Sequence, residues 1–136
     1  MRPTNRRREI LMGNSIMDLV AAAKAVVPEI SVDDVKALAG QDNVLIVDVR
    51  DDGEVASSGK IAGAIHASRG MLEFRADEAT PFHNKAFSKD KTIVLYCGSG
   101  GRAALGGKAL LELGYNDVRN LGGFQAWVDA GGEVEK

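Results

Sequence analysis

The chain has 136 residues, of which 45% are hydrophobic and 26% are charged, and its formal net charge is −2. These values are typical of one globular domain with a sizeable core, and they exclude a wholly disordered chain. Because the net charge is close to zero, the composition predicts no general attraction to nucleic acid or to a membrane surface. No stretch of sequence is apolar enough to span a bilayer.

Cysteine and histidine are scarce in this chain. Cys97 is the only cysteine, and His66 and His83 are the only histidines. A lone cysteine cannot form an intramolecular disulfide and is typical of a reducing compartment, so we expect a cytoplasmic protein. Because a metal centre would have few soft ligands, we expect neither a bound metal nor another cofactor.

The N-terminal part divides into two segments. Residues 1–12 include four arginines and are predicted to form a flexible basic tail. We expect a tail rather than a secretory signal, since polar residues interrupt the apolar stretch that follows. Residues 13–28 place apolar side chains at helical spacing and end at Pro28, which predicts a helix. This helix either caps the domain or pairs with a second copy in a homodimer. We assign residues 29–136 to one domain.

The segments after Pro28 alternate between helix and strand. Ser31 followed by Asp34 predicts a helix N-terminus, and Gly40 is expected to end that helix. Residues 44–49 are apolar except for Asp48, which predicts a central strand of a parallel sheet covered on both faces. The elements predicted next are a short polar helix (51–58), a short strand (61–66), a short helix (69–75), an irregular segment (77–89), a second central strand (93–97), a helix (102–113), a third strand (117–121) and a last helix (124–130). This alternation indicates an α/β fold with right-handed crossovers.

Two of these helices have an inward face that helical spacing assigns. The residues expected to be buried are Leu105, Ala109, Leu110 and Leu113 in the first, and Phe124, Trp127 and Val128 in the last. Gly106 and Gly107 should each weaken the first of these helices by about 1 kcal/mol relative to alanine. Their presence is explained if that helix lies very close to the sheet.

Cys97 lies where a predicted buried strand ends and a helix begins. Between it and Arg102 stand only small residues, namely Gly98, Ser99, Gly100 and Gly101. Such a loop lets backbone N–H groups converge on one point, and the helix N-terminus adds its positive dipole end. This environment stabilises a thiolate, so we predict a nucleophilic Cys97 rather than a small buried structural cysteine.

The loop is compatible with two reactions of an anionic sulfur. Cys97 can carry sulfur as a persulfide, or it can carry phosphate as a cysteinyl phosphate. The guanidinium of Arg102 could bind an anionic substrate as a fork. Asp48 and Arg50, at the end of the first central strand, form either part of the site or a structural ion pair. His66 is either an acid/base or, more in keeping with its apolar strand, a structural histidine.

From residue 30 to residue 134 the chain resembles a single-domain rhodanese-like protein, a sulfurtransferase family. The matching pieces, in chain order, are LIVDVR (45–50), a glutamate at 54, GKIAGAIHASRG (59–70), IVLYCGSGGRAALGGKALLELGY (93–115) and LGGFQAW (121–127). The resemblance implies a single domain with a parallel, about five-stranded sheet and helices on both faces.

The resemblance also implies roles for individual residues. Cys97 would carry the sulfane sulfur, and the backbone N–H groups from Gly98 to Arg102 would hold it. Arg102 would also attract an anionic donor. Asp48 and Arg50 would support the loop structurally, and Arg69 could line the mouth of the site. The family's loop runs six residues from cysteine to arginine, as it does here, whereas the loop of the related phosphatases is one residue longer.

Two positions depart from the family's pattern. The family often has arginine directly after the cysteine, where this chain has Gly98, so a small anionic donor such as thiosulfate is expected to bind weakly. The usual Gly-His-Ile reads Gly59-Lys60-Ile61, and the missing histidine is expected to be structural rather than catalytic.

We therefore predict a sulfurtransferase that moves a sulfane sulfur from a donor such as thiosulfate to a thiophilic acceptor, cyanide or a thiol, through a persulfide on Cys97. The predicted partners are a small anionic donor and a thiol acceptor, which includes a protein thiol, with no nucleic acid or membrane. The alternatives are a phosphatase or arsenate reductase of the same fold, and a non-catalytic binding or sensing module.

Overall fold

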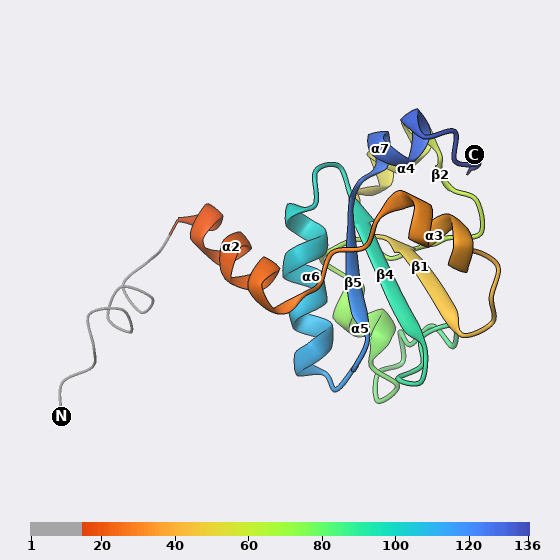
Figure 1. Cartoon of the computed structure of the whole chain (residues 1–136). Helices are drawn as coiled ribbons and strands as arrows, with labels where there is room; N and C mark the ends of the chain where they lie inside the picture. Colours follow the sequence, from red (N-terminus) through yellow and green to blue (C-terminus); the bar gives the residue numbers. More distant parts are fainter. Residues whose placement is uncertain (1–14) are drawn as a thin grey trace, which may run out of the picture.

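Four parallel strands form the main sheet of the computed structural model, which describes residues 15–136 (Figure 1). In spatial order they are β3 (Ile65–His66), β1 (Val44–Asp48), β4 (Thr92–Cys97) and β5 (Val118–Gly123). An isolated parallel bridge between Glu29 and Asn120 adds one pairing to β5. The predicted α/β fold with a parallel sheet is therefore confirmed. The main sheet has four strands and this single bridge, whereas about five strands were predicted.

Helices cover both faces of this sheet (Figure 1). One face packs against α6 (Gly101–Glu112) and α5 (Leu72–Ala76), and α2 (Ile16–Val26) lies against α6. The other face packs against α3 (Val32–Leu38) and α7 (Phe124–Asp129). The helix α4 (Asp52–Ser58) follows β1, and a small antiparallel pair is formed by β2 (Lys60–Ile61) and β6 (Val134–Glu135).

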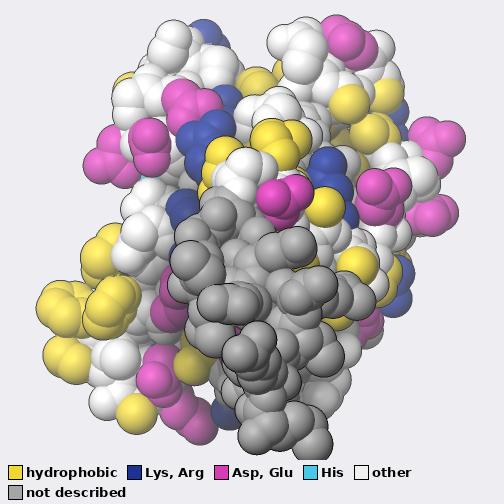
Figure 2. Space-filling model, turned by 90° about the vertical axis from the view of Figure 1, so that its left-hand side faces the viewer, with side chains coloured by type: hydrophobic (Ala, Val, Ile, Leu, Met, Phe, Trp, Pro, Cys, Tyr) yellow, Lys and Arg dark blue, Asp and Glu magenta, His cyan; other side chains and the backbone are white. Residues whose placement is uncertain are grey.

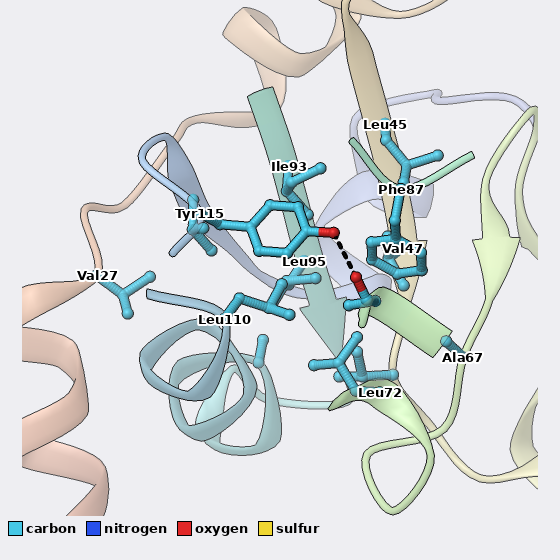
Figure 3. Packing of buried hydrophobic residues seen from close by; sticks show 14 of the residues in the cluster. Val27, Leu45, Val47, Ala67, Leu72, Phe87, Ile93, Leu95, Leu110 and Tyr115 are labelled. Carbon is cyan, nitrogen blue, oxygen red and sulfur yellow. Dashed lines mark hydrogen bonds between the residues drawn. The ribbon is translucent and has the colours of Figure 1, made fainter. Parts of the chain in front are cut away.

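The strand β4 is buried on both faces, as its continuous apolar sequence predicts. Ile93, Leu95 and Cys97 belong to the core under α5 and α6, whereas Val94 and Tyr96 belong to the core under α3 and α7. Figure 3 shows the first of these cores, where the hydroxyl of Tyr115 donates a hydrogen bond of 2.7 Å to the carbonyl oxygen of Ala76. Burial raises the pKa of Tyr115 to about 12.

The inward face of α6 is made mainly of small residues, which corrects the prediction from spacing. The fully buried residues are Ala103, Ala104, Gly106, Gly107 and Leu110, whereas Leu105, Ala109 and Leu113 are only partly buried. A Cβ atom at Gly106 would lie 2.7 Å from Leu72 Cδ2, and one at Gly107 would lie 2.9 Å from Val27 Cγ1. Because the two glycines have no side chains, α5 and the segment after α2 can pack closely against α6, as the sheet does.

The helix α7 also differs from the prediction in one residue. Phe124 and Trp127, three residues apart on one side of this six-residue helix, are buried, but Val128 is 38% exposed. The predicted inward position of Val128 is therefore wrong.

The N-terminal helix begins at a capping box, in which the hydroxyl of Ser15 accepts from the Asp18 backbone and the Asp18 carboxylate accepts from the Ser15 backbone. Val20 and Ala23 are buried against the domain, while its outward side exposes Ile16, Met17, Leu19 and Val26. Its pairing with a second copy stays a prediction. The predicted tail at residues 1–12 lies outside the described residues. Within 15–136, no helix has the length and apolarity needed to cross a membrane.

Candidate active site

Cys97 is the last residue of β4, and the loop that follows turns directly into α6. The parallel register pairs Asp48 with Tyr96 and Cys97 with Gly123, so β1, β4 and β5 bring their carboxyl ends to one edge of the sheet. The Cys97 side chain is fully buried, and its Sγ accepts a hydrogen bond of 2.9 Å from the backbone N–H of Gly100. This is one of the backbone donors that the sequence predicts for the loop.

The loop closes because Gly100 adopts a left-handed conformation, with φ of +100°. A residue with a side chain rarely adopts this conformation, and here a Cβ atom would also lie 3.2 Å from the Cα of Gly122. The turn at Gly100 brings its N–H back toward Cys97 Sγ and starts α6 at Gly101.

The edge strand β5 holds the loop from the side. The amide Nδ2 of Asn120 donates 3.1 Å to the carbonyl oxygen of Gly100, and its Oδ1 accepts from the backbone N–H of Gly122 at 2.8 Å. A Cβ atom at Gly123 would lie only 2.5 Å from the carbonyl oxygen of Gly98. The absence of a side chain at Gly123, in the Leu-Gly-Gly segment (121–123), therefore lets β5 approach the loop. Asn120 is a site residue that the sequence did not predict.

Arg102 is already paired with a carboxylate. Its Nη1 lies 2.5 Å from Oε1 of Glu54 and its Nη2 lies 3.0 Å from Oε2, which makes a bidentate fork. The hydrogen bond from Arg102 lowers the pKa of Glu54 to about 2, and the same bond raises the pKa of Arg102 above its ordinary value. The fork predicted to meet an anionic substrate is thus engaged by Glu54.

The resemblance matches Glu54 to the family but implies no role for it. It stands three residues after Asp51, whose backbone N–H donates to its Oε1 at 3.2 Å, at the start of α4. That spacing is the ordinary signal of a helix N-terminus, and nothing local points to Arg102, which lies 48 residues further on.

Asp48 and Arg50 form a buried ion pair beside the loop. Arg50 Nη2 lies 2.7 Å from Asp48 Oδ2, and it also donates 2.6 Å to the carbonyl oxygen of Gly59. The guanidinium carbon stacks 4.2 Å from the ring centre of Phe124. Burial opposes the charge of Arg50, but the hydrogen bond and charge of Asp48 outweigh it and raise the pKa of Arg50. These contacts tie β1 to α4 and α7.

Two further candidates have contacts away from the thiol. His66 Nε2 lies 2.7 Å from the carbonyl oxygen of Arg50, and its Nδ1 is 3.6 Å from Asp52, which fits a structural histidine. The guanidinium of Arg69 pairs with Glu73 at 2.5 Å, and its Cδ lies over Gly106 of α6. Its predicted place at the mouth of the site stays a prediction.

A pocket of about 170 Å³ opens beside the loop. It is lined by the loop residues Ser99 and Gly100, by residues of β5, and by Lys24 and Glu29 from the N-terminal part. Val20 of α2 lies 3.7 Å from the position of a Cβ atom at Gly101. The N-terminal helix α2 therefore forms part of the wall of this pocket through Lys24. Among the described residues, no cluster of His, Cys, Asp and Glu side chains could hold a metal ion.

A parallel α/β domain with a cysteine in a glycine loop at a helix N-terminus has the architecture of a cysteine-dependent group-transfer protein. Residues 31–130 match the model of the rhodanese-like domain, and the chain belongs to that family.

Individual proteins match as well. A sulfurtransferase of Allochromatium vinosum is 35% identical over 95 residues, which cover 69% of this chain and 80% of that one. The thiosulfate sulfurtransferase GlpE of Coxiella burnetii is 30% identical over 86 residues, covering 62% and 72%. A solved structure from Rhodopseudomonas palustris, described as a protein of unknown function and possible tyrosine phosphatase, is 36% identical with a TM-score of 0.83 over 99% of both chains.

Proposed function

We propose that this protein is a rhodanese-type sulfurtransferase that carries a sulfane sulfur as a persulfide on Cys97. The observation that carries the proposal is the hydrogen bond of 2.9 Å from the Gly100 backbone N–H to Cys97 Sγ, inside a six-residue loop at the start of α6. A backbone donor and a helix N-terminus aimed at one sulfur stabilise negative charge on it. Such charge is present on the thiolate that attacks the donor and on the persulfide that carries the transferred sulfur. The sulfurtransferase relatives support the same reaction class.

The reaction has two steps. The Cys97 thiolate attacks the outer sulfur of thiosulfate, a new S–S bond forms, and the S–S bond of the donor breaks. Sulfite leaves with the electron pair of that bond. A thiophilic acceptor then attacks the terminal sulfur of the Cys97 persulfide and regenerates the thiolate, so cyanide becomes thiocyanate and a thiolate becomes a persulfide. A protein thiol is an acceptor of the same chemistry.

A phosphatase or arsenate reductase is the second candidate, and the Rhodopseudomonas structure described as a possible tyrosine phosphatase favours considering it. Two features of this chain speak against it. Only four residues separate Cys97 from Arg102, so the loop is small for a phosphoryl group with three outer oxygens. The Arg102 fork, which would bind such oxygens, is engaged by Glu54. A non-catalytic module has no need of the donor aimed at Cys97.

The test is the mass of the purified protein before and after incubation with thiosulfate. We expect a gain of one sulfur atom, which is absent in Cys97→Ser and removed by cyanide with release of thiocyanate. Met71→Leu, a volume-conserving change outside the loop, is the control and should gain sulfur normally. If no sulfane donor adds sulfur while Cys97 hydrolyses an aryl phosphate, the phosphatase assignment replaces this one.

A further inference from the structure

The space beside the second residue of the loop is occupied by an ion pair. At Gly98, where the family often has arginine, a Cβ atom would lie 3.1 Å from Arg102 Nη2 and 3.7 Å from Glu54 Oε2. Arg102 is therefore folded back over Gly98, together with the carboxylate that neutralises it. The positive charge that a second arginine would bring to the loop is absent, and the charge of the remaining arginine is balanced.

The other arginines considered for the site are balanced in the same way. Arg50 pairs with Asp48 at 2.7 Å, and Arg69 pairs with Glu73 at 2.5 Å. Lys24 makes no ion pair within residues 15–136, but it lines the pocket beside Ser99 together with Glu29. Within residues 15–136, the arginines considered for the site are therefore all paired with carboxylates, and the contact to Cys97 Sγ comes from a neutral backbone donor.

We propose that Glu54 is a positioning residue that sets donor specificity, because its pairing with Arg102 disfavours a dianionic donor relative to a thiol persulfide of low net charge. This inference rests on the proposed sulfur transfer and names the donor class of the same site. Because Glu54 balances the charge of Arg102, the two negative charges of thiosulfate meet no net positive charge from this pair. A thiol persulfide brings one negative charge at most on its reacting sulfur.

The chemical step is the same for both donors. The Cys97 thiolate attacks the outer sulfur of the persulfide, the S–S bond of the donor breaks, and the thiolate of the donor leaves with the electron pair. The leaving groups differ, since thiosulfate releases sulfite, a dianion, whereas the persulfide releases a thiolate with a single negative charge on its sulfur. Charge near Arg102 should therefore change the ratio of the kcat/KM values for the two donors without altering the chemical step.

Glu54→Gln tests the proposal, because it removes the negative charge while the glutamine oxygen can still accept from Arg102 Nη1 and the Asp51 N–H. The bond from Arg102 Nη2 is lost, because an amide NH2 group does not accept. The donors are thiosulfate and cysteamine persulfide, whose ammonium balances its persulfide charge. We expect kcat/KM for thiosulfate to rise roughly five- to tenfold, mainly through KM. We expect the value for cysteamine persulfide to change less than about twofold.

Asp52→Asn is the matched control. It makes the same charge change two residues away in α4, and the Asp52 side chain is 95% exposed and does not touch Arg102. In this control, the ratio of the kcat/KM values for the two donors should stay within about twofold of the wild-type ratio, because exposed charges are strongly screened. A fall in kcat for both donors in Glu54→Gln would overturn the proposal, since Glu54 would then serve the transfer itself.

Binding of thiosulfate to Cys97→Ser separates this inference from the proposed function, because it needs no sulfur transfer. Adding Glu54→Gln to that variant should tighten the calorimetric dissociation constant of thiosulfate several-fold at low ionic strength, with the gain shrinking at about 0.5 M salt. An unchanged dissociation constant overturns the role of Glu54. Failure of wild-type Cys97 to accept sulfur from either donor instead overturns the proposed function.

Discussion

Asn120 is bonded to Gly100 across the edge of the sheet, with its Nδ2 donating 3.1 Å to the Gly100 carbonyl oxygen. The other end of the same amide accepts from the Gly122 N–H at 2.8 Å. Asn120 is 4% exposed, so water does not replace these partners. A single buried amide thus connects β5 to the turn that aims a backbone donor at Cys97.

Asn120→Ala should therefore damage both stability and sulfur loading. It leaves the Gly100 carbonyl and the Gly122 N–H without this partner, which costs about 1–3 kcal/mol for a buried group. Loading of Cys97 from thiosulfate, followed by mass, should slow because the Gly100 turn loosens. The control is Asn84→Ala, which loses a bond of 2.9 Å to the Ala86 N–H in the segment after α5. Equal loading defects in the two variants would contradict this role of Asn120.

Gly123→Ala should push β5 away from the loop. Its Cβ atom would lie 2.5 Å from the backbone carbonyl oxygen of Gly98, which cannot rotate aside as a side chain would. We expect a loss of about 1–3 kcal/mol in the free energy of unfolding by urea, and slower loading of Cys97. Gly53→Ala is the matched control. A Cβ atom there meets nothing within 4 Å, so the protein should be unchanged or up to about 1 kcal/mol more stable.

Features fixed by neighbouring residues could be predicted from the sequence. The apolar runs of β1 and β4, the stop at the glycines and the Ser31 cap all depend on residues close in the chain. The hydroxyl of Ser31 accepts from the Asp34 N–H at 3.1 Å, as predicted. The position of Cys97 at the carboxyl edge followed from the same local pattern.

Contacts between distant segments could not be predicted in this way. Glu54 of α4 meets Arg102 of α6 across 48 residues of sequence, and Asn120 of β5 meets Gly100 next to the shift in the β4–β5 register between Leu95 and Tyr96. Helical spacing failed for α6, because its small residues, rather than its leucines alone, make the closest contacts.

The pair of Asp48 and Arg50 should behave as one buried unit. Arg50→Met leaves the Asp48 carboxylate, which is fully buried, without its partner, and this costs about 3–5 kcal/mol. The double variant Asp48→Asn with Arg50→Met should lose less than the sum of the two single losses, since no buried charge remains. Urea unfolding of the three variants measures this coupling. Additive losses would mean that the two side chains stabilise the domain independently.

The pair of Glu54 and Arg102 predicts how stability changes with acid. Glu54 has a pKa of about 2 in the folded protein and an ordinary value of 4.5, because Arg102 donates to its carboxylate. A lowered folded pKa stabilises the fold above about 4.5, and this stabilisation is lost as the pH falls toward 2. The wild type should therefore lose more stability between about pH 7 and pH 3 than Glu54→Gln, which has no carboxylate there to protonate.

Both side chains are more than a third exposed, so added salt should shrink the difference. Urea unfolding of both proteins at the two pH values measures it, and parallel losses would show that the pair contributes nothing to folding.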